Sequence, residues 1–241
     1  TEAATRAEEK VGLDVENDVS YFRTLHSYAF NQVGMTREKM MGSEDYKEFG
    51  EKCGIPIKVA KFSEGDGTFN SDNEYLTIIN TAAVKRVDLL EYYDSRKNIL
   101  DIERNTLFLL AEELKRFKEE KGLKDFNDLL EDFIAKEKHN KFEVLFIDEA
   151  QDLSLLQWEM VRKMWSKAEK TYIAGDDDQA IFKWAGADVD HFIALKEEVD
   201  DIQTLDQSYR IPGGPIHELS QKIIGQVQNR FDKNYKPRDL K

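Results

Sequence analysis

Residues 142–152 read Phe-Glu-Val-Leu-Phe-Ile-Asp-Glu-Ala-Gln-Asp, a stretch that indicates the fold class. The apolar run at residues 144–147 is mostly β-branched or aromatic, which is typical of a strand buried on both faces of a parallel sheet. Asp148 and Glu149 follow directly, at the edge where open α/β sheets bind ligands. One acid there can hold Mg²⁺ while its neighbour takes a proton from an attacking water. In a structural alternative, both acids complement the N-terminus of a helix that starts near Leu153.

Two further segments along the chain have the same pattern, in which an apolar run is followed by polar residues. Residues 171–174 precede Gly-Asp-Asp-Asp-Gln at 175–179, and residues 202–205 precede Asp-Gln-Ser-Tyr-Arg at 206–210. A strand–helix–strand unit takes roughly 30 residues, and residues 155–167 carry an amphipathic helical pattern. Right-handed crossovers would place all three strand ends at one sheet edge. An acid pair, an amide and a guanidinium at one edge suit a nucleoside triphosphate.

The polar segments resemble motifs of a known family. DEAQD (148–152), GDDDQAIFKWAGA (175–187) and QSYR (207–210) are similar, in order and spacing, to motifs II, III and IV of superfamily 1A DNA helicases of the UvrD/Rep/PcrA type. Three shorter stretches resemble the tail of motif Ia, motif Ib and the D-F-x-D-L-L segment of the family: TEAATRA (1–7), FRTLHS (22–27) and KDFNDLL (124–130).

The resemblance implies an α/β fold, with a RecA-like P-loop NTPase parallel sheet and an inserted, mainly helical 1B-like subdomain. Residues 1–30 would be the N-terminal part of RecA-like domain 1A, and residues 31–138 the 1B-like insertion. Residues 139–205 would be the C-terminal part of domain 1A, and residues 206–241 would hold motif IV and the start of a truncated second RecA-like domain. The chain contains no G-x-x-x-x-G-K-[ST] sequence, so we expect a fragment of a longer helicase rather than a natural protein without a P-loop.

The resemblance also implies the nucleotide chemistry, with ATP and Mg²⁺ as cofactors. Asp148 would hold the metal and Glu149 would activate the attacking water. Gln179 would sense the γ-phosphate and this water, because an amide can both donate and accept. Arg210 would contact the γ-phosphate, and Tyr209 would stack on the adenine. The structural alternatives are a turn position for Gln179, a core position for Tyr209 and, for Arg210, a salt bridge with Asp206 or Glu218.

An aromatic pair follows the motif III turn. Phe182 and Trp184 lie two residues apart, so an extended segment would project both rings to the same side. The resemblance implies that these rings stack on bases of single-stranded DNA. Ala185 stands where many relatives carry Arg, and the structural alternative for the two rings is a buried aromatic pair.

Further DNA contacts are implied upstream. Thr24 and His26 occupy motif Ib positions that touch single-stranded DNA, although a lone His is more often structural. Phe126 either faces DNA or begins a helix over residues 127–134.

The function implied by the resemblance is that of an ATP-dependent 3′-to-5′ DNA helicase whose partners are single-stranded DNA and single/double-strand junctions. Protein partners, and a pathway in repair, replication or plasmid maintenance, stay open. Two alternatives are the motor of a RecB/AddA-like helicase–nuclease and a non-catalytic DNA-binding or regulatory module. The YRIP sequence and the compact 1B-like region resemble those of phage-encoded members.

Composition limits the remaining classes. The 241 residues carry a net charge of −13, which disfavours tight nonspecific binding to duplex DNA more than movement along one strand. The single cysteine, Cys53, excludes an internal disulfide and fits a reducing compartment. No apolar stretch approaches the roughly 20 residues of a membrane span. We therefore expect a cytoplasmic protein of a bacterial or phage-infected cell.

The rest of the chain gives coarser expectations. They are a helix before a strand at residues 21–24, a polar helix over 35–53 with Thr36 as N-cap, a charged loop over 55–72, a strand or helix at 75–79, an amphipathic helix over 104–121 ended by Gly122, and a frayed terminus over 229–241.

Overall fold

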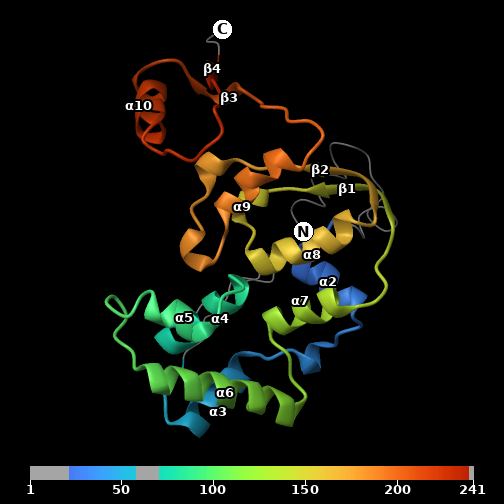
Figure 1. The fold of residues 1–241 in the computed structure, drawn as a ribbon, viewed down its shortest axis with the longest axis vertical. Helices are drawn as coiled ribbons and strands as arrows, with labels where there is room; N and C mark the ends of the chain where they lie inside the picture. The colour runs from blue at the N-terminus through green and yellow to red at the C-terminus, as the bar shows by residue number, and fades with distance from the viewer. Residues whose placement is uncertain (1–21, 58–70, 239–241) are drawn as a thin grey trace. The chain divides into compact units, whose positions relative to one another are not determined.

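The computed structural model describes residues 22–57 and 71–238 (Figure 1). Its elements are α2 (Leu25–Gln32), η2 (Arg37–Lys39), α3 (Ser43–Cys53), α4 (Glu74–Val84), α5 (Leu89–Asp94), α6 (Arg104–Lys121), α7 (Phe126–Ala135), β1 (Phe142–Ile147), η3 (Ala150–Asp152), α8 (Leu155–Trp165), β2 (Ala168–Ile173), η4 (Asp177–Gln179), η5 (Lys183–Ala185), α9 (Val189–Ala194), η6 (Leu195–Glu197), β3 (Gln207–Pro212), α10 (Pro215–Ile224) and β4 (Lys236–Arg238). Helices and parallel strands together confirm the α/β class at this level.

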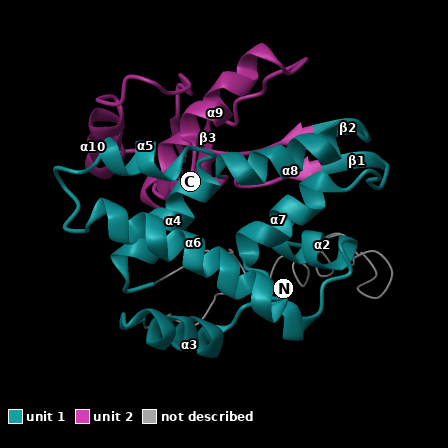
Figure 2. Cartoon of the chain, turned by 60° about the horizontal axis from the view of Figure 1, so that its bottom comes forward, with its two compact units in different colours: residues 1–145, 154–171 teal, residues 146–153, 172–241 magenta. Residues whose placement is uncertain are grey.

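The chain divides into two compact units, coloured separately in Figure 2. Unit 1 comprises residues 1–145 and 154–171, and unit 2 comprises residues 146–153 and 172–241. The mainly helical elements α2–α8 belong to unit 1, and the polar motifs that follow β1 and β2 belong to unit 2.

The first strand–helix–strand prediction is confirmed. Strands β1 and β2 pair in a two-stranded sheet, and α8 connects them along the chain. The Phe142 amide donates to the Lys167 carbonyl at 3.0 Å, and the Ala174 amide donates to the Ile147 carbonyl at 2.8 Å. Both strands advance together between these two bonds, so the pairing is parallel.

The prediction that β1 is buried on both faces is wrong for the described residues. Leu145 and Ile147 are buried, whereas Val144 is 44% and Phe146 is 73% exposed. Side chains alternate across a strand, so one face of β1 packs and the other is open. The Phe146 ring stacks on Tyr172 of β2 with centroids 5.0 Å apart, which covers part of the open face.

The predicted third strand is displaced along the chain. Residues 201–206 have no regular structure, and β3 begins only at Gln207. Leu205 is 90% exposed, so residues 202–205 are not buried in a sheet as a core strand would be. Strand β3 pairs in parallel with β4, in a sheet separate from β1 and β2. The expectation that three strand ends meet at one sheet edge is therefore wrong.

Pairing with β3 also orders the C-terminal segment that was expected to fray. The Lys236 amide donates to the Asp206 carbonyl at 2.6 Å, and the Lys236 ammonium lies 2.6 Å from the Asp206 carboxylate. Residues 236–238 thus pair in a strand where a frayed terminus was expected, whereas residues 231–235 have no regular structure and residues 239–241 lie outside the described part of the chain.

The described residues of the range 35–138, which are 35–57 and 71–138, are mainly helical and contain their own apolar core. Helices α3, α4 and α6 contribute most of one cluster of buried side chains: Met41, Tyr46, Phe49, Ile57, Leu76, Leu110, Leu114, Phe117 and Leu123. The amphipathic helix α6 spans residues 104–121 as predicted, and Gly122 ends it at a φ of 65°, a conformation that glycine adopts without strain.

One expectation in this helical region is settled and two are corrected. The ambiguous residues 75–79 belong to α4, which Asn73 caps by accepting from the Leu76 amide at 3.2 Å. The helix expected over 35–53 begins only at Ser43. Thr36 instead precedes the short η2 turn and makes no side-chain capping bond.

At the N-terminal side, residues 22–24 form no strand, so that prediction is wrong for the described residues. Thr24 is instead the N-cap of α2, where its Oγ1 accepts from the Ser27 amide at 3.2 Å. The helix expected before residue 21, the motif Ia-like stretch and most of the charged loop at 55–72 lie outside the described residues. Within the described part of the chain, no helix is both long and apolar enough to cross a membrane.

Candidate functional site

The acid pair of the first motif lies directly after β1, in unit 2. Asp148 and Glu149 are both exposed, and Asp148 Oδ1 accepts from the Glu149 amide at 3.0 Å. Glu149 adopts a left-handed backbone conformation, with a φ of 51° and a ψ of 39°. This conformation costs a non-glycine residue about 1–2 kcal/mol, and residues strained in this way cluster at functional sites.

Neither acid is the N-cap of the next helix, although their charges can still complement its N-terminus, so that alternative stays open. Ser154 is the N-cap of α8: its Oγ accepts from the Gln157 amide at 3.3 Å, and Gln157 Oε1 accepts from the Ser154 amide at 2.8 Å. Glu149 makes no side-chain capping bond. The two carboxylates therefore do not cap α8 and are open to solvent.

A buried amide joins the acid pair to the second polar segment. The Gln151 side chain is 1% exposed, and its Nε2 donates to Glu149 Oε2 at 2.8 Å. Its Oε1 accepts from the Asp176 amide at 2.9 Å. The same Nε2 lies 3.2 Å from Asp152 Oδ2. Burial, followed by the charge of Glu149, raises the pKa of the Asp152 carboxyl. Gln151 thus fixes the distance between the DEAQD and GDDDQ segments.

The glycine of the second segment allows this close approach. A Cβ on Gly175 would lie 2.8 Å from Gln151 Oε1 and 2.8 Å from the Phe192 ring. Real Cβ atoms do not come this close, so any side chain here would push the amide or the ring away. Gly175 is needed for the space it leaves.

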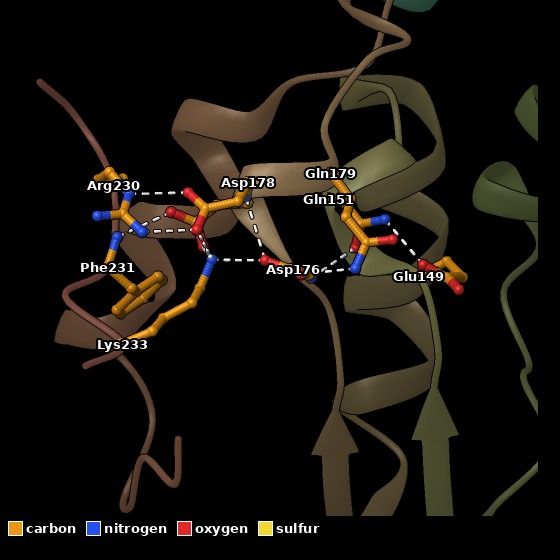
Figure 3. Close-up of polar contacts among 9 residues, drawn as sticks. Glu149, Gln151, Asp176, Asp178, Gln179, Arg230, Phe231 and Lys233 are labelled. Carbon is orange, nitrogen blue, oxygen red and sulfur yellow. Dashed lines mark hydrogen bonds and ion pairs between the residues drawn. The ribbon is translucent and has the colours of Figure 1, made fainter. Parts of the chain in front are cut away.

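Three consecutive acids follow, and a basic segment neutralises them (Figure 3). Lys233 Nζ contacts the carboxylates of Asp176, Asp177 and Asp178, the last at 3.0 Å. Arg230 binds Asp178 with two bonds, from Nε at 2.8 Å and Nη2 at 2.6 Å. Such a bidentate pair is among the stronger polar contacts in proteins.

These contacts set the ionisation of the acids. Burial raises the pKa of the Asp178 carboxyl, but hydrogen bonds from Arg230 and Lys233 outweigh it, so the pKa is below the ordinary value. Burial likewise opposes hydrogen bonds from Gln179 and Lys233 at Asp176, and the pKa there is also lowered. The carboxyls of Asp176 and Asp178 are therefore ionised at neutral pH, and basic side chains compensate their charge.

The amide expected to sense a phosphate is held by the same turn. Gln179 is exposed, and its Nε2 donates to Asp176 Oδ2 at 2.5 Å. Because Asp176 also bonds Gln151 through its backbone, Gln179 and Glu149 belong to one hydrogen-bonded chain: Glu149, Gln151, Asp176 and Gln179 (Figure 3). The structure thus connects two of the predicted site residues, although they are not in direct contact.

The aromatic pair is exposed, so the alternative of a buried pair is contradicted. Phe182 is 39% and Trp184 is 67% exposed, with ring centroids 6.5 Å apart at 50°. The expected extended segment is wrong, because residues 183–185 form a 3₁₀ turn that Phe182 precedes. The turn nevertheless leaves both rings adjacent to each other and accessible.

Strand β3 presents the two remaining nucleotide candidates. Tyr209 is 80% exposed, which contradicts the alternative of a core tyrosine. Arg210 is exposed and, among the described residues, forms no salt bridge with Asp206 or Glu218. No contact joins Arg210 to Gln179 or Glu149 in the described part of the chain, so the structure leaves Arg210 apart from the connected pair.

The candidate DNA residues of unit 1 make structural contacts. The side chain of His26 is buried, and its ring meets the edge of Phe126 with centroids 5.4 Å apart. Phe126 is the first residue of α7, which Asp125 caps by accepting from the Asp128 amide at 2.9 Å. The alternative that Phe126 begins a helix is confirmed, and Thr24 caps α2.

Sequence reasoning missed Gln151, Arg230 and Lys233. Gln151 lies inside the quoted DEAQD motif, but its burial is not encoded by any period in the sequence. Arg230 and Lys233 lie in a polar segment with no secondary-structure pattern. The available signal was the run of three aspartates, because such a concentration of negative charge requires nearby cations when it is partly buried.

The fold and these motifs indicate an α/β protein of the helicase class, and comparison with known proteins defines the family. The family model for the UvrD/REP helicase N-terminal domain matches residues 3–200, so the chain belongs to the UvrD/Rep helicase family.

Individual relatives match shorter stretches. The chain is 29% identical over 120 residues to the ATP-dependent DNA helicase Rep of Buchnera aphidicola, which covers 45% of the chain and 18% of that relative. It is 31% identical over 120 residues to Rep of Salmonella typhimurium, with the same coverage. It is 32% identical over 104 residues to PcrA of Staphylococcus aureus, covering 42% of the chain and 13% of PcrA. The matches thus span less than a fifth of each of these relatives.

Proposed function

We propose that the chain is part of an ATP-dependent DNA helicase that couples ATP hydrolysis to movement along single-stranded DNA in the 3′-to-5′ direction. The observation that carries the proposal is the hydrogen-bonded chain from Glu149 through Gln151 and Asp176 to Gln179. It ties an exposed carboxylate pair to an exposed amide and, a few residues further, to two exposed aromatic rings. The relatives Rep and PcrA are described as ATP-dependent DNA helicases.

The donor set after β1 suits Mg²⁺. Asp148 offers a carboxylate at an exposed strand end, bound only by the Glu149 amide among the described residues. No cluster of three or more His, Cys, Asp or Glu able to hold a metal occurs in residues 22–57 and 71–238. This fits a metal that is held by one or two carboxylates, waters and substrate phosphates. When bound, Mg²⁺ would neutralise charge on the phosphates of ATP.

The remaining roles follow from the chemistry of each side chain. Glu149 takes the proton of the attacking water, and its orientation is fixed by Gln151. Gln179 orients this water and the γ-phosphate, because its amide has both donors and an acceptor. Arg210 stabilises charge on the γ-phosphate, and Tyr209 stacks on the adenine. Both are exposed on β3 and make no competing ionic contact in the described residues.

For DNA, Phe182 and Trp184 form the base-stacking surface, because exposed adjacent rings can stack on successive bases of any sequence. Thr24, His26 and Phe126 form a second contact region in unit 1. Its support is weaker, because His26 is buried and Thr24 is already engaged as a cap.

The proposed domain organisation keeps the expected boundaries. Residues 1–30 and 139–205 belong to RecA-like domain 1A, residues 31–138 form a 1B-like insertion, and residues 206–241 begin a second RecA-like domain. The apolar core of α3, α4 and α6 supports a separately packed insertion. A P-loop, absent from these 241 residues, would be supplied by the longer protein. That protein would act inside a bacterial or phage-infected cell.

The test is ATP hydrolysis by the full-length protein. Glu149→Gln keeps the shape of the side chain but cannot accept a proton, so we expect unchanged ATP binding and a loss of turnover by at least about 100-fold. Glu143→Gln, an exposed position on β1, is the control. Parental turnover in Glu149→Gln would refute the assignment of the base. Absence of any DNA-stimulated hydrolysis in the parental protein would instead favour the non-catalytic module.

A further inference from the structure

The segment between α10 and β4 makes polar contacts that its sequence does not predict. Residues 230–233, here called the basic strap, contact residues 176–178, here called the acidic turn. Lys233, with a side chain 15% exposed, reaches all three carboxylates, and Arg230 holds Asp178 in a bidentate pair. The Phe231 amide adds a bond to Asp177 Oδ2 at 2.8 Å. Side chains and backbone of the strap thus fix every residue of the turn.

One of these contacts leads directly to the proposed site. Asp176 divides its carboxylate among three partners. Oδ1 faces Lys233 and also accepts from the Asp178 amide at 3.2 Å, and Oδ2 accepts from Gln179 Nε2 at 2.5 Å. With Lys233 in place, the carboxylate cannot rotate without losing an ion pair. The orientation of the Gln179 amide therefore depends in part on Lys233, a side chain that lies 54 positions further along the chain (233 − 179).

We propose that Lys233 is a positioning residue for ATP hydrolysis: through Asp176 it holds the Gln179 amide in the orientation that the γ-phosphate and attacking water require. Arg230 holds Asp178, at the other end of the acidic turn, through its bidentate ion pair. This inference rests on the proposed function, because it assumes that Gln179 acts on the nucleotide. It adds a role for a segment to which neither the motifs nor the comparisons assign one.

The arrangement also has a mechanical consequence. The strap connects α10 to β4, and β4 pairs with β3, which carries Tyr209 and Arg210. A displacement of β3 and β4 would therefore pull on Lys233 and, through Asp176, on Gln179. The strand that carries Tyr209 and Arg210 is thus linked, through β4 and the strap, to the side chain that holds Asp176.

The first experiment measures ATP turnover of the full-length protein with saturating single-stranded DNA. We expect Lys233→Met to lower kcat about tenfold or more, because a hydrogen bond to a charged group commonly contributes this much. KM for ATP should change far less, since the proposed role of Lys233 is to orient Gln179 and not to bind ATP. The control is Lys196→Met, whose exposed ammonium lies 4.0 Å from Glu197 in the same unit.

The decisive comparison uses Gln179→Ala. If Lys233 acts only through Gln179, then Lys233→Met should lower kcat no further in the Gln179→Ala background. A purely structural role would lower kcat by the same factor in both backgrounds and would overturn the inference. If Lys233→Met does not fold, Lys233→Gln, which keeps length and polarity but not charge, gives the same comparison.

A second readout is independent of catalysis. In the 241-residue chain, the side-chain amide resonance of Gln179 should shift in Lys233→Met and stay unchanged in Lys196→Met. An unshifted resonance in Lys233→Met would refute the positioning contact itself. A shifted resonance together with normal turnover in Gln179→Ala would instead show that the contact exists and that the proposed role of Gln179 in hydrolysis is wrong.

Discussion

The Gln151 side chain donates to Glu149 from Nε2 at 2.8 Å, and this bond forms between a buried amide and an exposed carboxylate. Glu149 sits in a left-handed backbone conformation with a φ of 51°, which an isolated glutamate would rarely adopt. The amide therefore has two effects. It holds a strained residue in place, and through its Oε1 it fixes the start of the next polar segment at the Asp176 amide.

The first prediction follows from the burial of Gln151. Gln151→Leu keeps approximate size but leaves the Asp176 amide without its acceptor, so we expect the free energy of unfolding to fall by about 2–3 kcal/mol. Urea unfolding of the 241-residue chain measures this. Gln203→Leu is the matched control, because Gln203 is exposed and, among the described residues, its side chain bonds only Asp201. Equal stability of the two variants would mean that the amide bridge contributes nothing.

The second prediction concerns the space next to that bridge. In Gly175→Ala, the added Cβ would lie 2.8 Å from both Gln151 Oε1 and the Phe192 ring. We expect a loss of about 1–3 kcal/mol in the free energy of unfolding, the range found for overpacked sites. Gly213→Ala is the control, since its Cβ would lie 3.6 Å from Pro237. A stabilised Gly175→Ala variant, measured by the same urea titration, would show that the amide and ring can move without loss.

Some of this architecture follows from sequence and some does not. The apolar run before Asp148 and the pattern of residues 155–165 identify β1 and α8, because a short apolar run and an i, i+3, i+4 period are local signals. The end of α6 at Gly122 is equally local. The face of β1 that is exposed, by contrast, depends on what packs against it, and the alternation of Leu145 and Phe146 does not reveal this.

Some residues of the candidate site can likewise be predicted from the sequence and others cannot. The residue types in DEAQD and GDDDQ identify Asp148, Glu149 and Gln179 as candidates, because their chemistry is visible in the letters. The sequence does not show that Gln151 connects them, because the same letter stands for a buried and for an exposed glutamine. The strap residues Lys233 and Arg230 meet the acidic turn across more than fifty positions of chain (233 − 176 = 57), and such long-range pairing has no period to detect. Strand β3 was misplaced because its pairing partner β4 is also distant in sequence.

The third prediction concerns how the stability of the fold changes at low pH. The folded-state pKa values of Asp176 and Asp178 are lowered, so their ion pairs stabilise the fold above the ordinary carboxyl pKa of about 4. This stabilisation is lost as the pH falls through the lowered values. We therefore expect Lys233→Met to be less stable than the parental chain by a constant amount at pH 5–7, and by a shrinking amount below about pH 4.

Urea unfolding at a series of pH values measures that difference. Lys196→Met is again the control, because its only partner among the described residues is Glu197 at 4.0 Å. A difference between Lys233→Met and the parental chain that persists undiminished at pH 3 would show that the strap stabilises the fold by packing rather than by ion pairs.

The last prediction separates a DNA motor from a simple ATPase. Trp184 is 67% exposed, so Trp184→Ala should leave the free energy of unfolding within about 0.5 kcal/mol of the parental value. In the full-length protein, loss of one base stack worth about 1–3 kcal/mol should weaken single-stranded DNA binding roughly 5- to 150-fold. ATP hydrolysis without DNA should change little, because Trp184 has no proposed role at the nucleotide and lies five residues beyond Gln179 (184 − 179). Ile181→Ala is the control, since Ile181 is 70% exposed in the same segment but has no ring to stack.

Fluorescence anisotropy with a labelled oligonucleotide gives the affinities. Unchanged affinity together with a collapse of basal hydrolysis would show that Trp184 supports the nucleotide site and not the DNA strand.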